Sequence, residues 1–128
     1  MKASLSNHHQ PPRKVRLVAD LIRGKSVADA KIALAFLPKK SAPAIEKLLN
    51  SAIANARSKG VSADNLFVQK ITVDKGVVMR RYRPFARGRA GTLRKTMSII
   101  NLELGTGKAQ GTRHKAQKKT KGTSSPKI

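Results

Sequence analysis

The sequence predicts an α+β fold, in which three amphipathic helices precede a pair of long antiparallel strands. Apolar residues recur at helical spacing through roughly the first sixty positions, and β-branched and apolar runs follow them. The link between the last two runs carries no helical pattern, so these strands are expected to pair antiparallel rather than through a parallel crossover. The 128 residues suffice for one domain with extensions.

The first helix is expected to begin at Pro11-Pro12, because proline suits a first turn in which its missing N–H would be unpaired anyway. Gly24 supplies a C-terminal stop. The apolar positions between them recur at i, i+3, i+4 and i+7, namely Val15, Val18, Ala19 and Ile22.

Two further helices follow. Ser26 and Asp29 form a variant of the capping box, with Asp in place of Glu, at the start of a short helix that Pro38 stops. The third pattern, from about residue 41 to residue 57, is the most regular, and Gly60 ends it. Its apolar stripe comprises Ile45, Leu48, Leu49, Ala52, Ile53 and Ala56.

The spacing then changes to that of strands. Residues 66–73 and 96–104 are rich in β-branched and apolar side chains, and residues 2–6 are a candidate third strand. Residues 74–76 indicate a bulge or kink rather than a turn, because Val77 and Val78 continue the strand pattern. The segment between the strands therefore extends the hairpin, and nine extended residues would span on the order of 30 Å.

The chain divides into a globular domain over residues 1–104 and a basic low-complexity tail over residues 105–128. The domain includes the extended hairpin at about residues 76–98. The tail is expected to be disordered, since it has little apolar surface to offset its ordering entropy. Its lysines would reinforce binding without sequence readout, namely Lys115, Lys118, Lys119 and Lys121.

Positive charge is the dominant feature of the composition. The formal net charge is +22, which would destabilise a compact domain by self-repulsion unless an anionic partner neutralised it. Residues 1–74 hold thirteen basic and five acidic side chains, whereas residues 75–128 hold fifteen basic side chains and only Glu103. Nucleic acid is the expected partner, and an anionic membrane surface is the competitor.

The charge is concentrated in the hairpin segment, residues 79–95. Arginine meets phosphate bidentately and stacks on bases, and neighbouring strand residues such as Arg80 and Arg81 face opposite surfaces. Pro84 is expected to end regular pairing, and Gly88 and Gly91 permit positive φ. The candidate RNA-binding residues of this segment are Arg80, Arg81, Arg83, Arg87, Arg89, Arg94 and Lys95.

Tyr82 and Phe85 either stack on bases or pack on each other, and the sequence favours neither. A second basic patch at the first helix would by itself be a solvated face, but on so basic a chain it is a candidate for RNA contact. It comprises Arg13, Lys14, Arg16, Arg23 and Lys25.

No enzymatic site is predicted. The six carboxylates are scattered, and no triad, carboxylate pair or phosphate-binding loop occurs. The chain has no cysteine, and His8-His9 without an acidic cluster is a poor metal site, so no metal or other cofactor is expected. Residues 1–10 lack the apolar stretch of a signal peptide and no run could span a membrane, which predicts a cytoplasmic protein.

The stretches "LVADLIRGK", "LLNSAIANA" and "RGRA" identify a family. Over residues 11–104 the sequence closely resembles the bacterial large-subunit ribosomal protein twenty-two family. The resemblance implies three helices on a three-stranded antiparallel sheet, seated on large-subunit (23S-type) rRNA near the exit of the peptide tunnel. It also implies help in subunit assembly, neighbouring large-subunit ribosomal proteins as partners, and neither a homo-oligomer nor a membrane.

The same resemblance assigns parts of the hairpin. Met79, Arg80 and Arg81 fall where the family's macrolide-resistance deletions lie. The tip, which would line the tunnel and meet the nascent polypeptide, comprises Arg87, Gly88, Arg89, Ala90 and Gly91. Three positions depart from the family pattern, namely Pro11 (usually Ser), Phe85 (often Arg) and Ile99 (often His).

Two other classes compete on composition alone. A DNA-architectural protein would insert basic β-arms into the minor groove, and such proteins are normally obligate dimers. A cationic membrane-surface protein would need an amphipathic basic helix, whereas the charge here lies in a hairpin and a tail.

Overall fold

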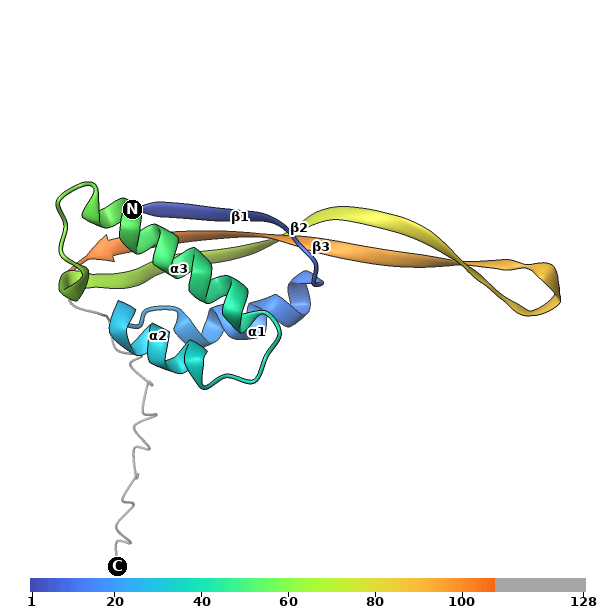
Figure 1. Cartoon of the computed structure of the whole chain (residues 1–128), viewed down its shortest axis with the longest axis horizontal. Coiled ribbons are helices and arrows are strands. Elements are labelled where there is room, and N and C mark those ends of the chain that lie inside the picture. The colour runs from blue at the N-terminus through green and yellow to red at the C-terminus, as the bar shows by residue number, and fades with distance from the viewer. Residues whose placement is uncertain (108–128) are drawn as a thin grey trace, which may run out of the picture.

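A computed structural model of the chain describes residues 1–107, so most of the predicted tail lies outside the described residues. The sheet has three antiparallel strands, β1 (Lys2–His8), β2 (Leu66–Pro84) and β3 (Ala90–Thr106), in the order β1-β3-β2. Beyond the end of β1, strands β2 and β3 continue together as a long two-stranded projection (Figure 1). The candidate strand at residues 2–6 is thus confirmed and slightly longer.

Three helices cover one face of the sheet: α1 (Pro12–Ile22), α2 (Val27–Ala35) and α3 (Ala42–Arg57) (Figure 1). Two short 3₁₀ turns, η1 (Ala63–Asn65) and η2 (Ala86–Gly88), precede and follow β2. The α+β fold with three helices on a three-stranded antiparallel sheet is therefore confirmed.

Local chemistry explains where the helices begin and end. The Ser26 hydroxyl accepts a hydrogen bond of 3.1 Å from the Asp29 backbone N–H and donates one of 2.7 Å to the Asp29 carboxylate. The predicted cap is confirmed, although the carboxylate bonds to the hydroxyl rather than to the Ser26 backbone N–H. Gly24 and Gly60, each with φ 76°, adopt the left-handed conformation that ends α1 and α3.

The core lies between the helices and the inward face of the sheet. All the apolar positions predicted for α1 and α3 are buried there. The strands contribute the alternating residues that face the helices. The largest fully buried side chains of the core are Ile22, Ile45, Leu49, Leu66, Ile71, Ile100, Leu102 and Leu104.

The predicted kink at residues 74–76 is a shift in strand register between Lys75 and Val78. Gly76 lies at this shift, close to β3. A Cβ atom on Gly76 would lie 3.3 Å from the Met97 carbonyl oxygen and 3.4 Å from Cγ1 of Ile99. Glycine therefore allows β2 and β3 to approach closely where the projection leaves the domain.

The core makes a direct prediction about stability. Leu49 is fully buried, so Leu49→Ala should lower the free energy of unfolding by about 2–5 kcal/mol through lost apolar burial and the cavity left behind. Leu17 is 66% exposed on the outer face of α1 and serves as the control. Leu17→Ala should change the free energy of unfolding by less than about 0.5 kcal/mol. Urea denaturation measures both, and equal losses would contradict this assignment of the core.

Candidate nucleic-acid interface

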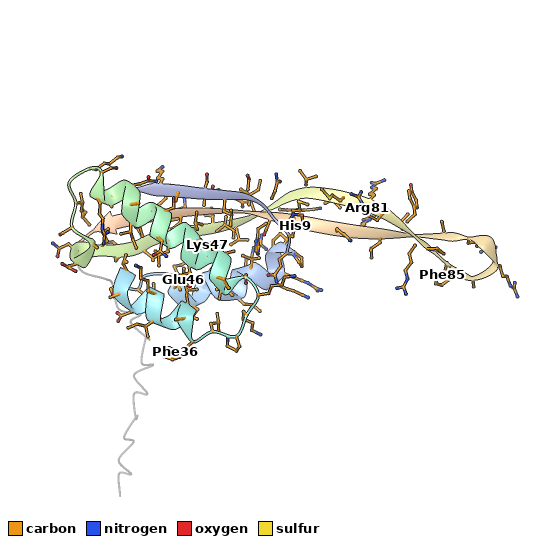
Figure 2. All side chains as sticks on the ribbon, in the orientation of Figure 1. His9, Phe36, Glu46, Lys47, Arg81 and Phe85 are labelled. Atoms are coloured by element: carbon orange, nitrogen blue, oxygen red, sulfur yellow. The ribbon has the colours of Figure 1, made fainter. Side chains whose placement is uncertain are left out.

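The projection, here called the ribbon (residues 78–96), is a continuous antiparallel ladder. Its pairs run from Val78 opposite Thr96 to Pro84 opposite Ala90, and β2 ends at Pro84, as predicted. Residues 80–90 are all exposed. Arg81 and Phe85 lie on the ribbon well away from the helices (Figure 2). The structure therefore presents the predicted hairpin arginines to solvent.

The register divides the ribbon into two faces, because successive strand residues point in opposite directions. One face carries Arg80, Tyr82, Pro84, Ala90, Thr92 and Arg94. The other face carries Met79, Arg81, Arg83, Gly91, Leu93 and Lys95. Both faces are cationic, so the ribbon is suited to a partner that surrounds it.

Like charges face each other directly across the ribbon. Arg80 is the cross-strand partner of Arg94, an arrangement that destabilises an isolated hairpin. The only carboxylate of residues 75–128, Glu103, forms a 3.0 Å ion pair with Lys2 in the globular domain. The hydrogen bond from Lys2 lowers the pKa of Glu103, so this carboxylate stays ionised and occupied there. Within residues 1–107 no carboxylate forms an ion pair with a ribbon residue, so the charge of the ribbon is available to an anionic partner.

The tip is a tight turn with strained backbone. Arg87 has φ 58° and ψ 40°, a left-handed conformation that costs a residue other than glycine roughly 1–2 kcal/mol. Gly88 also has positive φ, at 70°, and the Phe85 N–H donates a 2.8 Å hydrogen bond to the Arg89 carbonyl. Gly91 lies in the regular ladder opposite Arg83 and does not use the conformational freedom that the sequence offered.

The two aromatic residues of the ribbon are largely uncovered. Tyr82 is 74% exposed and Phe85 is 71% exposed. Exposure on this scale favours the base-stacking alternative over packing of the two rings on each other, because little of either ring is covered by protein.

The basic patch of α1 separates into two kinds of residue. Arg16 donates from Nε and Nη2 to the Val73 carbonyl, at 3.2 and 3.1 Å. Arg23 donates from Nη2 to the Ile71 carbonyl at 3.2 Å and pairs with Asp20 at 2.8 Å. Both arginines therefore occupy backbone groups of β2, a structural role that the sequence did not indicate.

These carbonyls belong to the outer edge of the sheet. Strand β2 is an edge strand, and the chain after α1 adds to it through Gly24 N–H to the Val68 carbonyl (3.0 Å) and Val68 N–H to the Lys25 carbonyl (2.9 Å). Covering an edge in this way blocks its pairing with other chains. Within residues 1–107, Arg13, Lys14 and Lys25 make no side-chain hydrogen bond or ion pair, so their charges are available to a ligand.

Other site types find no support in the described part of the chain. No group of three His, Asp or Glu residues there is placed to hold a metal ion. None of its helices is both long and apolar enough to cross a membrane.

A small α+β domain with a projecting ribbon of exposed arginines defines a nucleic-acid-binding protein whose charge is carried by a β-arm. The family model described as ribosomal protein L22p/L17e matches residues 3–105. The chain belongs to this family, which confirms the resemblance inferred from its motifs. Ribosomal proteins of this family are structural, which agrees with the absence of an enzymatic motif.

Relatives named large ribosomal subunit protein uL22 match over nearly their full length, and three of them illustrate the similarity. The relative from Pelobacter propionicus is 49% identical over 107 residues, covering 83% of this chain and 96% of its own. The relative from Citrifermentans bemidjiense is 50% identical over 103 residues, covering 80% and 93%. The relative from Bdellovibrio bacteriovorus is 50% identical over 105 residues, covering 81% and 96%.

Substitution of an arginine that bonds β2 and substitution of one that does not, both in α1, should have different effects on the free energy of unfolding. Arg16→Gln should lower the free energy of unfolding of the isolated protein by about 1 kcal/mol, because it removes the guanidinium that bonds the β2 edge. Arg13→Gln removes the same charge from the same helix and should leave the stability unchanged. Denaturation of both variants in urea measures the difference, and equal effects would refute the structural role of Arg16.

His8 makes stability depend on pH. Burial, and secondarily repulsion by His9, lowers the pKa of His8 below 6.5, and its Nε2 is buried without a hydrogen-bond partner. The unfolded chain then binds a proton more readily than the folded protein. Stability should therefore be highest above pH 6.5 and fall as the pH drops from that value toward the folded pKa. Urea denaturation measures the free energy of unfolding from about pH 8 to pH 5. This free energy should fall less with decreasing pH in His8→Gln than in His9→Gln, and identical pH profiles of the two variants would contradict the role of His8.

Proposed function

We propose that this chain is a structural constituent of the large ribosomal subunit, in which the ribbon binds 23S-type rRNA. The observation that carries the proposal is the direct opposition of Arg80 and Arg94 on an exposed ladder with no carboxylate of its own. Phosphates between and around these side chains would turn a repulsive pair into a binding site. Membership of the ribosomal L22p/L17e family supports rRNA and neighbouring ribosomal proteins as the partners.

The parts of the chain divide this task. The domain of residues 1–104 seats on the RNA, with Arg13, Lys14 and Lys25 as contacts beside the ribbon. The basic tail from residue 105 adds charge-driven affinity without base readout. By neutralising phosphates that would otherwise repel one another, the protein assists subunit assembly. It acts as a single copy in the cytoplasmic ribosome.

The tip has a separate role in this proposal. Arg87, Gly88, Arg89, Ala90 and Gly91 line the exit tunnel and meet the nascent polypeptide, and residues 79–81 form the region whose loss gives macrolide resistance. Family membership supports this assignment. The geometry fits it as well, because the tip is the part of the ribbon most distant from the helices (Figure 1).

Removal of the ribbon tests the function. Met79 and Lys95 are cross-strand partners, so an Asn-Gly turn in place of residues 80–94 closes the hairpin in register and leaves the domain intact. The full chain should prefer large-subunit rRNA over duplex DNA at about 0.2 M salt. The shortened chain should bind rRNA at least about tenfold more weakly, with a shallower salt dependence, because fewer phosphates are neutralised.

Binding of both chains across a salt series measures these effects. Circular dichroism of the shortened chain serves as the control for folding of the domain. Equal affinity for rRNA and DNA, fading together with salt, would contradict the ribosomal function and leave only unspecific polycation binding. The DNA-architectural alternative receives no support from the family to which the chain belongs.

A further inference from the structure

A cavity of about 610 Å³ lies at the root of the ribbon, where the chain from β1 to α1 passes β3. Figure 2 labels His9 at this junction, beside the point where the sheet narrows to two strands. The domain contributes His9 and Arg13 to the wall, and the ribbon contributes Met79, Arg94 and Lys95. The cavity thus lies between the domain and the ribbon.

One part of the wall is cationic. Arg13, Arg94 and Lys95 line the cavity, and no carboxylate does. Within residues 1–107 none of these three side chains is engaged in an ion pair or a side-chain hydrogen bond. Arg94 points to the face of the ribbon opposite to that of Lys95 and Met79. Arg13 and Lys95 are therefore the two available cations that form a candidate phosphate site on the Met79 side of the cavity.

The other part of the wall is apolar and soft. Met97 is only 3% exposed, yet it is not part of the main core, and Met79 beside it is half-buried. Methionine side chains adapt to flat or irregular partners and make favourable contacts with aromatic rings. Met97 leaves almost none of its surface free for a ligand, so the half-buried Met79 is the part of this wall that is suited to the face of a base.

The cavity is larger than a phosphate group alone would fill. The volume of about 610 Å³ is within the range of sites for small organic ligands. It is roughly twenty times the volume of one water molecule in the liquid. An occupant that contacts both parts of the wall carries an anionic group and an apolar, flat one within the same molecule.

We propose that the root cavity binds one unpaired nucleotide of the rRNA, with its phosphate on Arg13 and Lys95 and its base against Met79. This inference rests on the proposed function and adds a specific subsite to it. Proteins commonly recognise RNA through single unstacked nucleotides of loops and bulges. A nucleotide held here bridges the domain and the ribbon, so it fixes the direction in which the ribbon leaves the domain.

The three methionines of the chain provide the test. Met79 and Met97 line the cavity, whereas Met1 pairs with Leu104 at the other end of the sheet. With ¹³C-labelled methionine methyl groups, the full chain gives two reporting signals and one internal reference. On titration with adenosine monophosphate the Met79 and Met97 signals should shift and saturate while the Met1 signal stays in place. Inorganic phosphate should shift them less at equal concentration, because it leaves the apolar wall unoccupied.

A pair of charge-matched variants controls for the general attraction of a +22 chain for anions. Lys95→Gln removes one charge at the phosphate site of the cavity and should weaken the binding of adenosine monophosphate at least about fivefold. Lys59→Gln removes one exposed charge after α3, outside the cavity, and should leave the affinity within about twofold. Equal weakening in both variants, or equal shifts of all three methionines, would show diffuse binding and overturn the proposal.

Three further outcomes test the ligand of the cavity and separate this inference from the proposed function. If an aspartate-rich peptide moves Met79 and Met97 at lower concentration than adenosine monophosphate, the cavity binds a protein carboxylate and the nucleotide subsite is wrong. If these signals do not move while the chain retains its preference for large-subunit rRNA, the subsite fails and the ribosomal function stands. If the rRNA preference is absent, the ribosomal function fails, and the methionine signals still decide whether the cavity takes a nucleotide.

Discussion

Electrostatic repulsion inside the ribbon is the constraint to which the rest of the structure responds. Arg80 and Arg94 face each other, and further arginines follow on both faces with no acidic residue among them. A two-stranded ribbon is marginal in water even without such repulsion. Here its strands continue from the domain, where β3 lies between β1 and β2 and the sheet buries its inner face against three helices. The apolar base therefore holds an arm that could not form by itself, and the arm remains available for an anionic partner.

Arginines serve two opposite purposes in this chain, and their surroundings decide which. Those of α1 that reach the edge of β2 find backbone carbonyls to bond, so Arg16 and Arg23 stabilise the domain and shield the edge. Among the ribbon arginines, only Arg81 donates a hydrogen bond to a backbone carbonyl within residues 1–107. The bond from Arg81 to the neighbouring Arg80 carbonyl is local and exposed. The same side chain thus contributes to stability in one place and to recognition in the other.

The sequence predicts what depends on short-range patterns. The apolar stripe of α3, the cap at Ser26, the kink at residues 74–76 and the extension of the hairpin follow from residues close together in the chain, and the structure has all of them. What the sequence could not show depends on residues brought together from afar. Arg16 and the Val73 carbonyl are 57 positions apart, and the root cavity combines residues near position 10 with residues near position 95. The strained conformation of Arg87 was missed for a different reason, since turn geometry forces left-handed backbone on a residue that does not prefer it.

The direction of the ribbon is set at its root, and several features converge there. The register shift beside Gly76 bends β2, and the space for a Cβ atom at that position is already limited by the Met97 carbonyl. Pro11, at the start of α1, provides no side-chain cap and leaves the positive end of the helix dipole next to the root cavity. The proposed phosphate site therefore lies beside the uncapped N-terminus of α1, where the helix dipole adds positive potential to the charges of Arg13 and Lys95.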